Sequence, residues 1–358
     1  RWQENLVELQ RYAERGGDAG IDADMVAEIE RLSTQFITGR SVMFARRISD
    51  HKIVDGHADL RADDIFCLPD GPALLDCLEF DDCLRYVDVV DDAAFLAMDL
   101  EFLGRTDLAE MFKRRYVKSS GDDAPPDSLW HFFYIAYRAV VRAKVDCIRH
   151  EQQDEGAVAD ARRHLAIARD HLRAGAVRLI LVGGGGPGTG KTTLSRALAE
   201  EIGAQVISTD DVRAEMVRLG EIAGTPGGVL DEGGLYTGEN IDAVYDGVLR
   251  RAHLSLCEGR SVVLDGTWQD PRHRALARSM AADSGAVEIE FACTAPLDAT
   301  VARVKDRVQT TSQVTPEITV ALADRGDDVW PDAHPPIDTT GPQADSLAQA
   351  KEICALAL

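Results

Sequence analysis

The sequence predicts a two-part chain, in which a helical domain precedes an α/β domain with a parallel sheet. Its 358 residues, 45% of them hydrophobic, suffice for two cores of ordinary size. Residues 1–150 repeat apolar side chains at spacings of three and four, which indicates helices. From Val177 onward, apolar strands alternate with helical segments, which is typical of a parallel sheet. We expect a connecting helix at 151–175 and the second domain at 176–358.

Within the first domain the apolar spacing predicts three long helices, at 25–48, 91–118 and 128–150. A hairpin is expected between them, because two short apolar runs flank the turn "PDGP". Its strands would be residues 65–68 and 73–76. In the second domain, strands are predicted at 177–182, 205–208, 261–265, 287–293 and 337–339.

The charge balance limits the possible partners. The formal net charge is -22, from 61 acidic against 39 basic residues, so the surface repels phosphate backbones and anionic lipid. This argues against nucleic acid and membrane surfaces as partners. No apolar run approaches the roughly 20 residues that a membrane helix needs.

The cysteines and the start of the chain suggest where the protein works. The seven cysteines are scattered and form no CxxC pair, which predicts reduced thiols and a cytoplasmic protein. The chain begins with Arg, so we expect an upstream segment. Its oligomeric state is left open, and a homo-oligomer remains compatible with the sequence.

The segment "VGGGGPGTGKTTLSRALAEE" is the strongest functional signal. Gly185-x4-Gly190-Lys191-Thr192 fits the P-loop pattern, with an apolar strand before it and a helix after it. Glycines let backbone N–H groups surround phosphates, and the helix N-terminus adds its positive dipole end. Lys191 would neutralise the β- and γ-phosphates of ATP, and the Thr192 hydroxyl would bind Mg²⁺. The expected nucleotide-binding residues are Gly185, Gly186, Pro187, Gly188, Thr189, Gly190, Lys191, Thr192 and Thr193. The alternative is a glycine-rich turn that binds nothing, but spacing, lysine, threonine and flanking elements all favour phosphate.

The next strand ends in "STDDVR", which places two acids and an arginine at the carboxyl edge of the sheet, where α/β folds bind ligands. Asp210 could accept a proton from an attacking hydroxyl, and Arg213 could hold an anionic group. The alternative is that Asp210 or Asp211 caps the following helix. Both roles could be filled, one by each acid.

Two further elements carry charged residues that are candidates for the phosphate-binding site. Asp265 ends the strand "SVVLD" at the equivalent edge, where it could support Mg²⁺ or position the acceptor. Arg303 and Arg307 lie four residues apart on one helix face. On a lid they would cover the phosphates; otherwise they are surface arginines that pair with Asp298 or Asp306.

Together these motifs resemble the small P-loop kinases, namely the predicted kinases akin to gluconate kinase and the 5′-kinase domain of polynucleotide kinase. The resemblance covers about residues 177–340. It implies that Asp210 is the general base, that Arg213 binds the acceptor side, that Asp265 is the third acid and that "RVKDR" supplies the lid arginine. It implies ATP and Mg²⁺ as cofactors.

The first domain contains His57-Ala58-Asp59 followed by Asp64, and then Asp76 after a short apolar run. This layout resembles the catalytic loop and metal-binding acid of aminoglycoside phosphotransferases, and implies a helical lobe like their C-lobe. Alanine replaces the family's glycine, Asp64 replaces its asparagine, and residues 1–50 contain no glycine-rich nucleotide lobe. We therefore expect Asp59, Asp64 and Asp76 to form a degenerate second site that binds Mg²⁺ weakly.

The whole arrangement resembles actinobacterial fusions of an aminoglycoside-phosphotransferase-like part with an AAA-family ATP-binding part, here without the N-lobe. The expected function is transfer of the γ-phosphate of ATP to a small hydroxylated acceptor at the second domain. The alternative is an ATP-binding regulatory module with slow hydrolysis, whose helical lobe contacts a partner protein.

Overall fold

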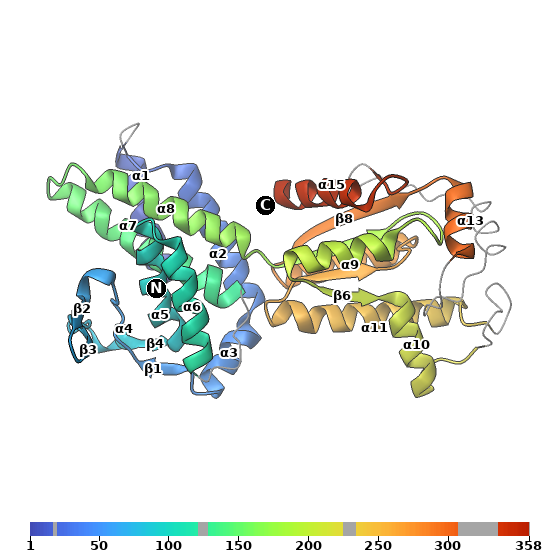
Figure 1. The fold of residues 1–358 in the computed structure, drawn as a ribbon, viewed down its shortest axis with the longest axis horizontal. Coiled ribbons are helices and arrows are strands. Elements are labelled where there is room, and N and C mark those ends of the chain that lie inside the picture. Colours follow the sequence, from blue (N-terminus) through green and yellow to red (C-terminus); the bar gives the residue numbers. More distant parts are fainter. Residues whose placement is uncertain (17–19, 121–127, 225–233, 307–335, 358) are drawn as a thin grey trace. The chain divides into compact units, whose positions relative to one another are not determined.

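The structure, a computed structural model, describes residues 1–16, 20–120, 128–224, 234–306 and 336–357. It divides into two compact units, Arg1–Ala176 and Val177–Leu358 (Figure 1). The first unit is mainly helical and the second is built on a parallel sheet, as the sequence predicts.

Long helices form the core of the first unit. Their bounds are α1 Trp2–Gly16, α2 Ala23–Gly39, α3 Ser41–Ser49, α5 Val89–Phe102, α6 Thr106–Ser120, α7 Ile135–Glu151 and α8 Ala157–Ala174. Helix α8 packs along α7 and places Leu165, Ala168 and Leu172 in the core shared with α1, α2 and α5 (Figure 1). The segment predicted as a connecting helix therefore belongs to the first unit.

The three helices predicted in this unit are each divided, which the sequence periodicity does not reveal. Buried Arg40 leaves the helical conformation at φ -122° and separates α2 from α3. After α5, Gly104 adopts φ 76°, and the Arg105 amide donates to the Leu100 carbonyl at 2.8 Å. This is a Schellman-type ending, which terminates a helix even where apolar spacing continues. A π-helical segment, Ser128–Tyr134, precedes α7.

Two small antiparallel sheets complete the first unit. Strand β1, Ile53–Asp55, pairs with β4, Tyr86–Asp88. Between these two strands in the sequence come the hairpin strands β2, Ile65–Leu68, and β3, Gly71–Leu74. The short helices Ala62–Asp64 and α4, Asp82–Arg85, flank the hairpin. Strand β3 begins two residues earlier than predicted, because the turn contains only Pro69 and Asp70. Asp76 consequently lies beyond the strand, with φ 61°.

The second unit has a five-stranded parallel sheet in the order β6-β7-β5-β8-β9. The strands are β5 Arg178–Gly183, β6 Gln205–Ser208, β7 Val262–Asp265, β8 Val287–Thr294 and β9 Ile337–Asp338. All five predicted strands are confirmed to within about two residues at each end. Because parallel strands share a direction, their carboxyl ends meet at one edge of the sheet.

Helices cover both faces of this sheet (Figure 1). On one face, Leu179 and Leu181 of β5 pack with α10, Thr209–Leu219, α11, Gly238–Cys257, and α12, Pro271–Asp283. On the other face, Ile180 and Val182 pack with α9, Lys191–Ile202, and α15, Gln343–Leu356. A further helix, α13, spans Leu297–Lys305. Burial on both faces explains why the central strands β5 and β7 are almost entirely apolar.

One pair of acids on β8 is expected to make the stability of this unit depend on pH. Arg278 of α12 donates two hydrogen bonds to the Glu290 carboxylate at 2.9 Å each, but its Nε lies 3.9 Å from Glu288. Burial, together with a hydrogen bond to the Glu290 carboxyl, raises the pKa of Glu288 from 4.5 to about 7. The folded protein therefore binds this proton more tightly than the unfolded chain.

We expect this contribution to be present below pH 4.5 and lost as the pH rises through about 7. Glu288→Gln should remove it, so the free energies of unfolding of the parent and the variant should diverge across this window. Urea unfolding at a series of pH values measures the difference. Glu352→Gln, at an exposed position of α15, is the control. Parallel pH curves for the parent and Glu288→Gln would contradict the expected linkage.

Candidate active site

The P-loop lies between β5 and α9, and its glycines adopt conformations that other residues avoid. Gly188 and Gly190 have φ values of 84° and 83°, and a Cβ on Gly188 would lie 2.5 Å from the Thr300 carbonyl oxygen. Gly190 is the N-cap of α9, and among the described residues no side chain caps this helix. The amide groups of its first turn, with the positive end of the helix dipole, therefore suit an anion.

Lys191 is buried within the loop that it follows. Its ammonium donates to the carbonyl oxygens of Gly185 at 3.1 Å and Gly186 at 2.8 Å, and to the Thr189 hydroxyl at 2.9 Å. The Thr189 hydroxyl in turn donates to the Gly186 carbonyl at 2.9 Å. The positive charge is thus held at the loop.

The side-chain oxygens of Thr192 and Asp265 form a hydrogen-bonded pair next to Lys191. Strands β5 and β7 are neighbours with Val182 opposite Asp265, and the Thr192 hydroxyl donates to the Asp265 carboxylate at 2.8 Å. Burial raises the pKa of Asp265, which the Thr192 hydroxyl and Lys191 oppose. A buried carboxylate beside a hydroxyl suits a hard cation, so these residues fit Mg²⁺.

Asp210 and Arg213 lie on the first turns of α10. The Arg213 guanidinium donates to the Asp210 carboxylate at 3.2 Å and lies over the Tyr236 ring at 4.2 Å. Asp210 is close enough to Asp265 that its negative charge contributes to the raised pKa of Asp265. The structure thus brings the predicted base, its arginine and the acid predicted to bind metal to one edge of the sheet.

The suggestion that Asp210 or Asp211 caps α10 was wrong. The N-cap is Ser208, whose hydroxyl accepts a hydrogen bond from the Asp210 amide at 3.3 Å. Serine is as good a cap as aspartate, so the sequence alone did not distinguish them. Neither carboxylate is therefore needed to cap α10.

Arg303 is half-buried and contacts the P-loop. From α13 it donates to the Gly188 carbonyl of the P-loop at 3.2 Å and to the Thr339 carbonyl at 2.6 Å. The Thr339 hydroxyl donates to the Thr189 carbonyl at 2.8 Å. These contacts fix two carbonyl groups of the P-loop, those of Gly188 and Thr189. The sequence did not point to Thr339, which follows β9. Contact between Arg303 and phosphate stays a prediction, and Arg307 lies outside the described residues.

The three acids predicted as a second site do not form a metal-binding cluster. Asp59 and Asp64 both face Arg61, at 3.8 Å and 3.3 Å, and Asp76 lies beyond the hairpin strand. Among the residues that the structure describes, no group of three His, Cys, Asp or Glu side chains is placed to hold a metal ion. Weak Mg²⁺ binding by these acids stays a prediction, and Arg61 would compete with the cation for Asp59 and Asp64. Burial still raises the pKa of Asp59.

The loop that carries Asp59 is instead fixed by acids of α5. The Asp92 carboxylate accepts from the amides of His57 at 3.0 Å and Ala58 at 2.7 Å. Buried Arg138 donates to the Ala58 carbonyl at 3.0 Å and pairs with Asp91 at 2.7 Å. Ala58 has φ 65°, a left-handed conformation that these bonds maintain. The loop is therefore ordered, although its acids are neutralised by arginine.

No helix within the described parts of the chain is both long and apolar enough to cross a membrane.

Comparisons with known proteins find matches to the second unit. A family model described as an AAA domain matches residues 179–324. Among solved structures, a putative kinase from Chloroflexus aurantiacus is similar at 19% identity and a TM-score of 0.38, over 50% of this chain and 98% of that one. A gluconokinase from Sinorhizobium meliloti is similar at 16% identity and a TM-score of 0.36, over 51% and 92%.

Two mycobacterial proteins match nearly the whole chain. The uncharacterized protein Rv2004c of Mycobacterium tuberculosis is 54% identical over 353 residues, which is 99% of this chain and 69% of that protein. The uncharacterized protein Mb2027c of Mycobacterium bovis matches with the same identity and the same coverage. The match spans both the helical unit and the P-loop unit, so the chain belongs to the same protein family as Rv2004c and Mb2027c.

Proposed function

We propose that the second unit is a kinase that transfers the γ-phosphate of ATP to a hydroxyl group of a small molecule. The observation that carries this proposal is the Thr192–Asp265 hydrogen bond of 2.8 Å at the edge of the sheet, where Asp210 comes two residues after Ser208, the residue of β6 opposite Asp265. A P-loop alone binds nucleotide. A second carboxylate next to the metal-binding pair supplies the proton acceptor that transfer to a hydroxyl requires.

Each residue has a role that follows from its position. The amides of the loop and of the α9 N-terminus bind the phosphates, and Lys191 exchanges its carbonyl partners for phosphate oxygens. Thr192 and Asp265 would hold Mg²⁺, which when bound neutralises charge on the phosphates. The acceptor oxygen forms a bond to the γ-phosphorus as the bond to the ADP oxygen breaks, and Asp210 takes the hydroxyl proton.

Arg213 and Tyr236 favour a small polar acceptor. Arg213 is buried, lies over the Tyr236 ring at 4.2 Å and touches Asp210, so guanidinium, aromatic ring and carboxylate meet at one place. An anionic or hydroxyl group of an acceptor can bind the guanidinium while a second hydroxyl reaches Asp210. The net charge of -22 gives no support to a nucleic-acid acceptor.

The proposal is tested by measuring ADP release from MgATP in the presence of sugars, aminosugars and nucleosides. We expect the rate to rise sharply with one chemical class and a phosphorylated product to appear. A slow rate that no member of the panel changes would contradict the kinase and favour an ATP-binding regulatory module.

A substitution in the first unit should leave this activity nearly unchanged. Asp59 faces Arg61, and the described residues hold no three-acid metal cluster. Asp59→Asn is therefore expected to change acceptor-stimulated ADP release by no more than about twofold, the usual effect of a change remote from the chemistry. A severe loss, comparable with that of Asp210→Asn in the same assay, would show that the loop around Asp59 takes part in the reaction.

A further inference from the structure

The turn that follows β7 contains a buried tryptophan in a strained conformation. Trp268 is fully buried and has φ 51°, in the left-handed region that residues with a side chain rarely adopt. Its amide donates to the Tyr245 hydroxyl at 3.0 Å, and its indole Nε1 donates to the Leu264 carbonyl at 3.2 Å. Arg274 donates to the Trp268 carbonyl at 2.6 Å. The amide, the indole and the carbonyl of Trp268 are thus all hydrogen-bonded, and these bonds maintain the left-handed conformation.

This turn is joined to the P-loop and directly follows the metal-binding acid. The amide of Gly184, which has φ 73° at the start of the P-loop, donates to the Thr267 carbonyl at 3.2 Å. The Gly266 amide donates to the Val182 carbonyl of β5 at 3.3 Å. Asp265 is the residue before Gly266. A displacement of the turn would therefore move Gly184, at the start of the P-loop, and also Asp265, the hydrogen-bond partner of Thr192.

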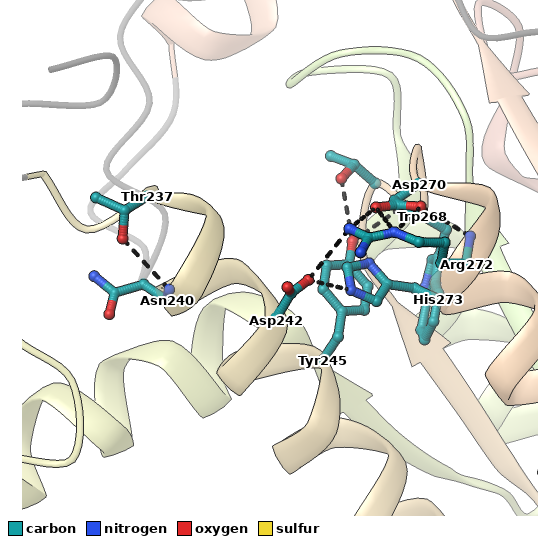
Figure 2. Close-up of polar contacts among 9 residues, drawn as sticks. Thr237, Asn240, Asp242, Tyr245, Trp268, Asp270, Arg272 and His273 are labelled. Carbon is teal, nitrogen blue, oxygen red and sulfur yellow. Dashed lines mark hydrogen bonds and ion pairs between the residues drawn. The ribbon is translucent and has the colours of Figure 1, made fainter. Parts of the chain in front are cut away.

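Tyr245 of α11 contacts the turn through its hydroxyl group (Figure 2). Besides accepting from the Trp268 amide, its hydroxyl lies 3.2 Å from the Thr267 hydroxyl. The tyrosine ring stacks on the ring of His273 with centroids 4.2 Å apart and an interplanar angle of 10°. His273 Nε2 lies 2.8 Å from the carboxylate of Asp242, one turn before Tyr245 on α11. The tyrosine ring is thereby fixed between α11 and the start of α12.

We propose that Tyr245 is a positioning residue of the nucleotide site, which acts through the Thr267–Trp268 turn on Gly184 and Asp265. The proposal rests on nucleotide binding at the P-loop, but not on the identity of the acceptor. Without the hydroxyl, the buried Trp268 amide loses its partner while the left-handed conformation still costs energy. The turn then relaxes, and the Gly184 amide loses its fixed acceptor.

The test is Tyr245→Phe, which keeps the stacked ring and removes only the hydroxyl. Titration calorimetry with MgADP, well below the unfolding temperature, should show a Kd about five- to tenfold higher than that of the parent, as expected for loss of one buried hydrogen bond. In turnover, KM for ATP should rise more than kcat falls. A tyrosine that only stabilises the fold would lower the unfolding temperature and leave the Kd of the folded protein unchanged.

The matched control is Tyr116→Phe, which removes another hydrogen-bonded hydroxyl, donated to the Val89 carbonyl at 2.9 Å in the first unit. Its Kd for MgADP should equal that of the parent. Thr267→Val provides a milder second variant, because it loses the hydroxyl contact to Tyr245 and keeps the carbonyl that Gly184 uses.

An unchanged Kd in folded Tyr245→Phe, or in Thr267→Val should the first variant not fold, would overturn the positioning role. Failure of the parent protein itself to bind MgADP is a different result. It would overturn nucleotide binding at the P-loop, and with it both the proposed kinase and the role of Tyr245.

Discussion

Replacing Lys191 with alanine is expected to lower ATP turnover by about two orders of magnitude or more, a loss of roughly 3 kcal/mol of charge stabilisation. Lys191 is buried at the P-loop, where its ammonium contacts the carbonyl oxygens of Gly185 and Gly186. Removal of this charge leaves the negative charge that accumulates on the phosphates during transfer without its partner. ADP release at saturating MgATP measures the effect.

Two controls separate this loss from a general effect of removing a lysine. Lys351→Ala removes an exposed lysine of α15, whose partner is Glu201, and should leave turnover unchanged. Circular dichroism and thermal unfolding should show that Lys191→Ala is folded, since the ammonium also holds the loop. Normal turnover in a folded Lys191→Ala protein would eliminate the P-loop as the site of reaction.

Asp210→Asn should lower phosphotransfer by about 10²- to 10⁴-fold, the usual contribution of a general base, with little change in MgADP affinity. Asparagine keeps the shape of aspartate and still offers an oxygen to Arg213, but it accepts no proton. Helix α10 is not weakened, because Ser208 rather than Asp210 caps it. Acceptor-stimulated ADP release and MgADP titration together give the two quantities.

Asp211→Asn is the matched control, because Asp211 is the next residue of α10 and is exposed. It should retain most of the activity. If Asp211→Asn abolishes transfer and Asp210→Asn does not, the base has been assigned to the wrong one of the two acids. If both variants lose MgADP affinity as well as transfer, the role of Asp210 is structural.

The sheet of the second unit could be predicted because its central strands, β5 and β7, are buried on both faces and therefore read as apolar runs. The helices of the first unit were predicted with their breaks missing. Apolar spacing continues across Gly104 and Arg40, and what ends each helix is a local backbone conformation at φ 76° or φ -122°. Such conformations are poorly encoded in periodicity, although glycine after a helix is a usable signal.

The candidate site was predictable where its geometry follows from sequence order. The P-loop is a continuous motif, and Asp265 reaches Thr192 because the carboxyl ends of adjacent parallel strands meet. Thr339 and Tyr245 could not be found this way. Thr339 contacts the P-loop across 150 residues of sequence, and Tyr245 reaches the Trp268 amide across 23. Nothing in their own surroundings in the sequence marks them.

The partners of Lys191 also determine which molecules can displace them. The Lys191 ammonium already donates hydrogen bonds to two carbonyls and one hydroxyl. A ligand that replaces these acceptors therefore gains only the difference in binding free energy between its own oxygens and theirs. Charged phosphate oxygens are stronger acceptors than neutral ones, so a polyphosphate wins this exchange and a sugar or free nucleoside does not. We therefore expect the loop to bind charged phosphate compounds in preference to uncharged ones.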